Sequence, residues 1–163
     1  MLLGQEGQMD EPAPAALTVA QLRELRKELQ LPERRLDLGV TLYTHQLQAP
    51  IRPHLELCDL VSLWTWRAAD LRELEKTFEQ FEKAVPNKRR LLGLYLWDFG
   101  TKQPMPLDLM KHQCGLGLKW LQEGWVEGLI LLGTNLCDLD LETVAWAKKW
   151  VSMVGNRPLR SRH

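Results

Sequence analysis

The sequence lacks the features that mark several specialised classes of protein. Its 21 Lys and Arg residues balance 21 Asp and Glu residues, so charge alone favours neither nucleic acid nor an anionic membrane as a partner. The three cysteines, Cys58, Cys114 and Cys137, show no C-x-x-C spacing, which argues against a disulfide framework or a structural zinc site. No apolar run approaches the roughly 20 residues that a transmembrane helix needs.

Local catalytic motifs are missing too. There is no G-x-S-x-G, G-x-G-x-x-G, P-loop or H-E-x-x-H, so no serine nucleophile, cofactor or metal is expected. The N-terminus, M-L-L-G-Q-E-G-Q-M-D-E-P, has no basic segment and no long apolar core, unlike a signal peptide. A cytoplasmic location is therefore the default expectation, unless an N-terminal portion is missing.

The composition suits one globular domain. The chain has 163 residues, of which 45% are apolar and 26% charged, and this length predicts a single domain. A Pro- and Ala-rich lead-in covers residues 1–16, the domain spans residues 17–154, and a short basic tail follows at residues 155–163.

Helical and strand-like patterns alternate along the domain. Thr18 and Gln21 form a capping box, with Leu22, Leu25 and Leu29 at helical spacing behind it. Asp70 is expected to cap a later helix, and Gly124 to end another. The apolar patterns predict strands at residues 36–43, 59–66, 90–97 and 126–133, and helices at residues 18–29, 50–57, 70–85, 107–123 and 140–153.

This alternation predicts an α/β fold with a parallel sheet. Strands joined through helices form right-handed crossovers, and nearly continuous apolar strands are typical of sheets covered on both faces. Two architectures fit: a doubly wound α/β sandwich, and half of a TIM (β/α)8 barrel, since a whole barrel needs about 250 residues.

Each predicted strand ends in polar groups, and three of the four ends also offer an aromatic ring. In parallel α/β folds, function gathers at these carboxyl ends. A sugar ring stacks its C–H face on an aromatic plane and needs directional partners for its hydroxyl groups, so the ends suggest a carbohydrate site. They are Tyr43-Thr44-His45, Trp64-Thr65-Trp66, Trp97-Asp98-Phe99 and Gly133-Thr134-Asn135.

Two segments resemble a known superfamily. L-G-L-Y-L-W-D-F-G-x-x-x-P-M-P-L-D-L-M and V-E-G-L-I-L-L-G are similar to segments of uncharacterised bacterial proteins among the glycoside-hydrolase-like TIM barrels. The resemblance covers roughly residues 9–154. It implies that the four strands correspond to strands 5–8 of the barrel, and that the chain is a fragment or partial version of that fold.

The resemblance also implies a pair of catalytic carboxylates. Members of the superfamily place an acid/base after the fourth strand and a nucleophile after the seventh, positions that Glu11 and Asp98 match. The family pattern is Asn-Glu and Glu, whereas this chain has Asp10-Glu11 and Asp98. The other interpretation makes Asp10 and Glu11 a solvated turn and Asp98 a cap for its own loop. The residues expected to bind the sugar are Asp10, Tyr43, His45, Trp64, Trp66, Trp97 and Asn135.

A half barrel raises a problem of association. It has two unpaired edges and an exposed apolar face, both of which favour contact with another chain. The chain is therefore expected to be part of a longer protein, or to close a barrel as a homodimer, or to flatten its sheet between its own helices. The functional expectation is a domain that binds or hydrolyses a glycan; the alternative is a non-catalytic binding or scaffold domain.

Overall fold

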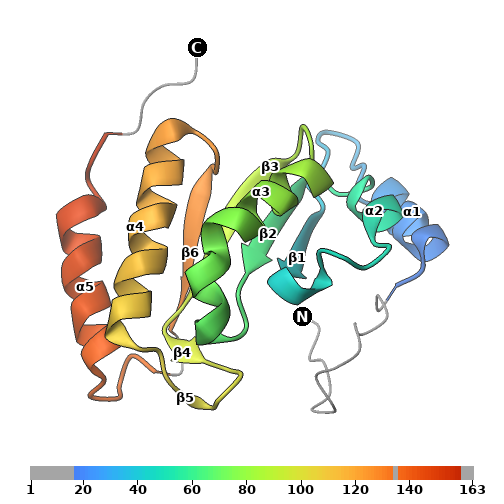
Figure 1. Cartoon of the computed structure of the whole chain (residues 1–163). Helices are drawn as coiled ribbons and strands as arrows, with labels where there is room; N and C mark the ends of the chain where they lie inside the picture. The colour runs from blue at the N-terminus through green and yellow to red at the C-terminus, as the bar shows by residue number, and fades with distance from the viewer. Residues whose placement is uncertain (1–16, 134–135, 159–163) are drawn as a thin grey trace.

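The fold is α/β, with a four-stranded parallel sheet at its centre (Figure 1). The computed structural model describes residues 17–133 and 136–158. The parallel strands are β1 (Gly39–Tyr43), β2 (Leu60–Trp64), β3 (Arg89–Tyr95) and β6 (Gly128–Leu132), and they lie side by side in sequence order. The predicted parallel sheet alternating with helices is confirmed.

Helices connect the successive parallel strands and also flank the sheet at both ends of the chain. α1 (Val19–Glu28) begins at Thr18, and its predicted capping box with Gln21 is present. α4 (Leu107–Glu123) ends at Gly124, which has a left-handed φ of 77°, as predicted. The remaining helices are η1 (Thr44–Gln46), α2 (Arg52–Leu55), η2 (Ala68–Glu73), α3 (Leu74–Ala84) and α5 (Glu142–Val154).

The two faces of the sheet have different neighbours. Figure 1 shows α3 and α4 lying over the same face, where Leu63 and Leu94 are fully buried. A Cβ added at Gly117 of α4 would come 3.0 Å from Leu129 and 3.2 Å from Leu92, so glycine here lets the helix lie close to the sheet. Above this face, Phe78 of α3 stacks on Trp120 of α4 with ring centroids 4.0 Å apart.

The opposite face, called the second face below, is partly open. Because strand side chains alternate between faces, this face presents Tyr43, Ser62, Trp64, Gly93, Tyr95, Ile130 and Leu132. Toward the β6 edge, Ile130 and Leu132 are 37% and 40% exposed among the described residues. The sheet is thus covered by helices on one face and shows apolar surface on the other.

Two local expectations were wrong. Asp70 does not cap the third predicted helix, because the chain enters it through the 3-10 turn η2, and neither η2 nor α3 has a capping side chain from its own N-cap residue. The third strand ends at Tyr95 rather than Trp97. Beyond it the chain forms an antiparallel hairpin of β4 (Trp97–Asp98) and β5 (Gln103–Pro104).

Candidate functional site

Aromatic side chains gather at the carboxyl ends of the first three strands. Tyr43 and Trp64 end β1 and β2, Tyr95 ends β3, and the loops after these strands add the other members. Contacts between rings join all of them into one group, called the aromatic cluster: Tyr43, His45, Trp64, Trp66, Tyr95 and Phe99.

Trp66 is at the centre of the aromatic cluster. Its ring stacks on Phe99 at 4.9 Å between centroids and meets the edges of Tyr43 at 5.5 Å and Tyr95 at 6.4 Å. Trp66 itself is half-buried, and its indole N–H has no acceptor in the part of the chain that the structure describes. A buried donor without an acceptor is costly, so the packing of Trp66 against the neighbouring rings offsets this cost.

The hydroxyl groups of the cluster tie β1 to β3. Tyr43 and Tyr95 share a side-chain hydrogen bond across the intervening strand β2. Burial first, and then this hydrogen bond, raise the pKa of Tyr95, so its hydroxyl remains protonated. The Trp64 indole N–H donates to Ser62 Oγ at 3.0 Å. The buried part of the cluster is therefore fixed by polar contacts as well as by packing.

His45 is the exposed member of the aromatic cluster. Its ring lies parallel to that of Tyr43, with an interplanar angle of 6° and centroids 5.6 Å apart. Partial burial and then the charge of Arg67 lower the pKa of His45, and Asp70 opposes them. At neutral pH the imidazole is therefore neutral, and it provides one hydrogen-bond donor and one acceptor.

Asp98 faces its own loop and the start of η2. Its carboxylate accepts hydrogen bonds from the Thr101 hydroxyl at 2.7 Å and from the Gly100 backbone N–H at 3.0 Å, and also from the backbone N–H of Ala68. Burial raises the pKa of Asp98, but these hydrogen bonds outweigh it and hold the pKa below the usual value. Asp98 thus supplies the acceptor at the start of η2 that was expected from Asp70.

The structure brings together four of the residues expected to bind a sugar. Tyr43, His45, Trp64 and Trp66 all belong to the aromatic cluster. Trp97 is half-buried in β4 and makes none of the ring contacts found among the described residues. Asp10, Glu11 and Asn135 lie outside the described residues, so the distance between the two expected catalytic carboxyl groups stays a prediction.

Two cluster members, Tyr95 and Phe99, were not among the expected site residues. Tyr95 is the true end of β3, which the continuous apolar run from Leu91 to Trp97 hides. Phe99 was seen in the strand-end triplet but has no polar group. Its aromatic ring, directly after Asp98 in that triplet, was the available signal.

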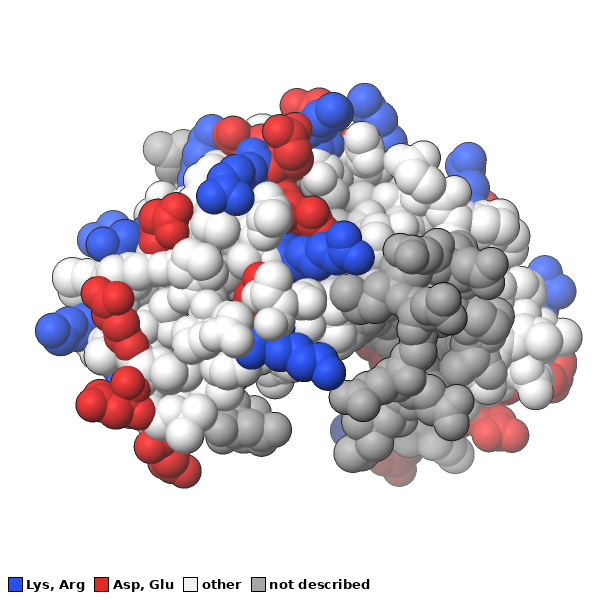
Figure 2. Space-filling model, turned by 60° about the horizontal axis from the view of Figure 1, so that its bottom comes forward, with Lys and Arg blue, Asp and Glu red and all other residues white. Residues whose placement is uncertain are grey.

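Charges around this end of the molecule are mixed. Figure 2 looks toward the end at which the strands finish and shows acidic and basic side chains separated by uncharged ones, with no continuous patch of one sign among the described residues. Individual charged side chains, rather than the electrostatic field of a large patch, therefore determine which ligand charges are attracted here.

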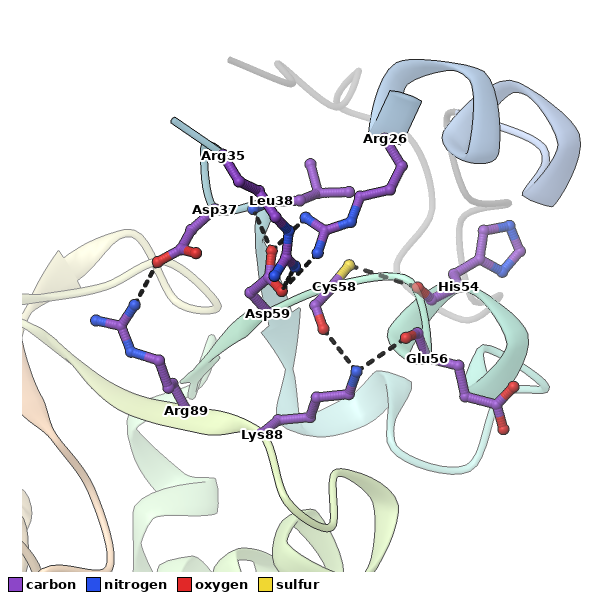
Figure 3. Close-up of polar contacts among 10 residues, drawn as sticks. All are labelled: Arg26, Arg35, Asp37, Leu38, His54, Glu56, Cys58, Asp59, Lys88 and Arg89. Atoms are coloured by element: carbon purple, nitrogen blue, oxygen red, sulfur yellow. Dashed lines mark hydrogen bonds and ion pairs between the residues drawn. The ribbon is translucent and has the colours of Figure 1, made fainter. Parts of the chain in front are cut away.

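The opposite, amino end of the sheet holds a network of ion pairs (Figure 3). Asp59, just before β2, receives Arg26 and Arg35 together with the backbone N–H of Leu38 at 2.8 Å. Lys88 donates to the carbonyl oxygens of Glu56 and Cys58 at 2.8 and 2.7 Å. The acid and bases named here all have partners within the chain, so these contacts have a structural role in joining α1 and the strand starts.

Neither a metal site nor a membrane span is found in the described residues. Within residues 17–133 and 136–158, no three His, Cys, Asp or Glu side chains are grouped so that they could hold a metal ion. Over the same ranges, no helix combines the length and apolar character needed to cross a bilayer. A small hollow of about 80 Å³ lies beside α2 and is lined by residues such as Arg52, Leu55 and Lys88, well below the roughly 300 Å³ of a typical ligand pocket.

Comparisons with known proteins gave no match: no family model, no curated protein and no solved structure is significantly similar to this chain.

Proposed function

We propose that this chain is a carbohydrate-binding domain with the architecture of half a (β/α)8 barrel, and that a sugar ring binds at the aromatic cluster. The observation that supports this proposal is the gathering of aromatic rings from three strand ends and their loops at one edge of a parallel sheet. In α/β folds of both candidate types, ligands bind at this edge.

The order of the strands favours the half barrel. A doubly wound sheet reverses its strand order at a switch point and has helices on both faces. Here the order is sequential, and α3 and α4 lie on one face (Figure 1). With right-handed crossovers, a sequential order places every crossover helix on the same side, which is the arrangement in a barrel wall.

The chemistry of the cluster suits a sugar. Half-buried Tyr43, Trp66 and Phe99 provide ring planes, while the exposed His45 imidazole provides a polar group beside them. Ligand sites typically combine mostly apolar walls with a few placed polar groups. A pyranose has matching properties, because its apolar C–H faces lie next to a rim of hydroxyl groups.

Binding is favoured over hydrolysis by the surroundings of Asp98. A lowered pKa keeps Asp98 ionised, as a nucleophile requires, but its oxygen atoms accept hydrogen bonds from Gly100, Thr101 and Ala68. These contacts are those of a residue that shapes a loop. Hydrolysis by Glu11 and Asp98 is the second candidate, since the chemistry needs two carboxyl groups about 5–10 Å apart.

Titration of a glycan panel against the purified chain tests the proposal. W66A should weaken binding about tenfold or more, because a central aromatic anchor typically dominates an interface. Trp66 also packs in the cluster, so W66F is the second variant and should retain intermediate affinity. The matched control is W125A, which removes an exposed tryptophan beside the amino end of β6 and should leave affinity unchanged.

The outcomes separate the candidates. Binding that W66A abolishes and W125A preserves supports the proposal. The proposed function is wrong if no glycan binds. It is also wrong if W66A and W125A have the same glycan affinity. Release of reducing sugar that E11Q and D98N abolish, with binding retained, would establish hydrolysis instead.

A further inference from the structure

Arg67 is a basic side chain held at the rim of the aromatic cluster. It follows Trp66 directly and immediately precedes η2. Its aliphatic stem lies against Gly100, because a Cβ added to Gly100 would come 2.5 Å from Arg67 Cγ. The hairpin loop therefore limits where the guanidinium group can point, while the residue as a whole stays exposed.

The guanidinium group of Arg67 is without an ion pair among the described residues. No carboxylate in residues 17–133 and 136–158 lies within ion-pair distance of it. The arginines of the amino end differ, since Arg26, Arg35 and Arg89 each contact Asp59 or Asp37. An arginine fork with no internal carboxylate is suited to bind one from a ligand.

A second basic group lies within electrostatic reach. The charge of Arg67 acts on the imidazole of His45, which is exposed and stacked on Tyr43. Asp70 is the one acidic group recorded as acting on His45, and it forms no ion pair with either base in the described part of the chain. An anionic group placed beside Arg67 and His45 would compete with Asp70 for Arg67 and would favour protonation of the imidazole.

We infer that the sugar bound at the aromatic cluster is acidic, with its anionic substituent held by Arg67 and assisted by His45. This inference rests on the proposed function and adds the ligand class. The ring stacks on the cluster, and a carboxylate or sulfate on that ring reaches the guanidinium group at the rim.

Paired ligands isolate the charge. The probes are oligogalacturonate, oligomannuronate and hyaluronan oligosaccharides, each compared with its methyl ester, and chondroitin sulfate oligosaccharides with methyl-esterified uronates, compared with their desulfated forms. Isothermal titration calorimetry should show binding of at least one acidic member and at least tenfold weaker binding of its neutral partner. The carboxylate and sulfate arms show which anion the site prefers.

Three variants assign the effect to this rim. R67Q should weaken binding of the acidic ligand about tenfold, the effect of losing a charge-assisted hydrogen bond, and leave the neutral partner unaffected. D70N should strengthen acidic binding about two- to threefold, a gain that misfolding does not produce. R52Q, on an exposed arginine of α2, is the control and should change nothing.

The inference fails separately from the proposed function. Equal affinity for acidic and neutral partners, unchanged in R67Q and D70N, overturns the acidic ligand while glycan binding stands. Absence of any binding in the panel overturns both.

Discussion

The indole ring of Trp64 lies flat against the backbone of Gly93, its neighbour on the adjacent strand. A Cβ added at Gly93 would meet three ring atoms of Trp64 at 1.9, 2.2 and 2.3 Å. Trp64 as a residue is 6% exposed, and its ring contacts Tyr95 at 4.6 Å between centroids. Because Gly93 has no side chain, Trp64 fills the space above it on the second face. This contact supports the buried part of the aromatic cluster.

Replacing Gly93 by alanine should therefore destabilise the fold. Overpacking a filled site costs typically about 1–3 kcal/mol and occasionally more, and the contact here is with a rigid ring beside backbone. Urea unfolding followed by circular dichroism measures the change. The control is G115A, because a Cβ at Gly115 meets nothing within 4 Å and alanine in a helix gains up to about 1 kcal/mol over glycine. Equal stability of G93A and the parent chain would contradict this account of Trp64.

The order and type of the elements were predictable because long periodic segments have strong local signals. The capping box at Thr18 and the helix end at Gly124 each depend on residues within one turn of the helix. The end of β3 was not predictable, because Leu96 and Trp97 continue its apolar run across the break before β4. A hairpin made of two short strands depends on pairing that no local pattern reports.

The aromatic residues at the strand ends were predictable, but which of them come together was not. The strand-end triplets contain Tyr43, His45, Trp64 and Trp66, which the structure joins in the aromatic cluster, and their binding of a sugar stays a prediction. Which face each strand residue occupies was harder, because these strands are apolar on both faces. Leu63 and Leu94 face the helices, whereas Trp64 and Tyr95, each one position further along its strand, lie on the second face. A one-residue shift in register reverses every side chain.

Asp98 should act as a structural carboxylate. D98N removes the charge from a group that accepts hydrogen bonds from Gly100 and Thr101, at an expected cost of about 1–3 kcal/mol at pH 7. Because the folded pKa lies below the unfolded one, the stabilisation is present above the unfolded pKa and is lost as the pH falls through the folded pKa. The gap in unfolding free energy between the parent and D98N should therefore narrow between pH 7 and pH 3.

Asp70 provides the control for Asp98. It is exposed and does not cap its helix, so D70N should change the unfolding free energy by less than about 0.5 kcal/mol. A loss in D70N as large as that in D98N would show that the helix start depends on Asp70 after all.

Asp59 should be important for stability and irrelevant to ligand binding. D59N weakens the contacts with Arg26 and Arg35 and leaves the Leu38 N–H with a poorer acceptor. Because the Asp59 side chain is 18% exposed, the expected cost is moderate, about 1–3 kcal/mol. E24Q, in an ion pair exposed to solvent, should cost less than about 0.5 kcal/mol. Glycan affinity should be unchanged in both, and a loss in D59N at a temperature where it is folded would contradict a purely structural amino end.

Binding of an acidic glycan should strengthen as the pH falls below 6.5. Burial and Arg67 lower the pKa of His45 and Asp70 raises it, so the imidazole gains its proton below its ordinary value of 6.5. A second positive charge then faces the ligand carboxylate, worth about two- to fivefold in affinity for an exposed pair. Titrations from pH 7.5 to pH 5 measure the slope, and H45Q should flatten it. A pH profile that H45Q leaves unaltered would separate His45 from the ligand.

The unliganded chain should show the opposite trend in stability. A His pKa that is lower in the folded state than in the unfolded state stabilises the fold above the unfolded pKa. That contribution is lost as the pH falls from about 6.5 through the folded pKa. Unfolding in urea without glycan should therefore show a decline over this range that H45Q reduces.

The last prediction concerns the homodimer that would close a barrel. An eight-stranded barrel has one helix outside each junction between strands. This chain has α1 before β1 and α5 after β6, and Figure 1 shows them at opposite flanks of the sheet. Pairing β6 of one copy with β1 of another would bring α5 and the second copy's α1 to the same junction. Two copies would thus place two helices where a barrel wall has room for one.

We therefore expect a monomer in solution, measured by light scattering behind a sizing column at micromolar concentration. A chain lacking α1 is not a suitable comparison, because Arg26 of α1 binds Asp59 at the start of β2. The better variant is I130K, which places a charge on the partly exposed second face. If the parent chain is a dimer and I130K is a monomer, the second face is an interface between copies, and the conflict between α1 and α5 must be relieved by movement of one of them. If both are monomers, the apolar surface near β6 is available to a partner other than a second copy.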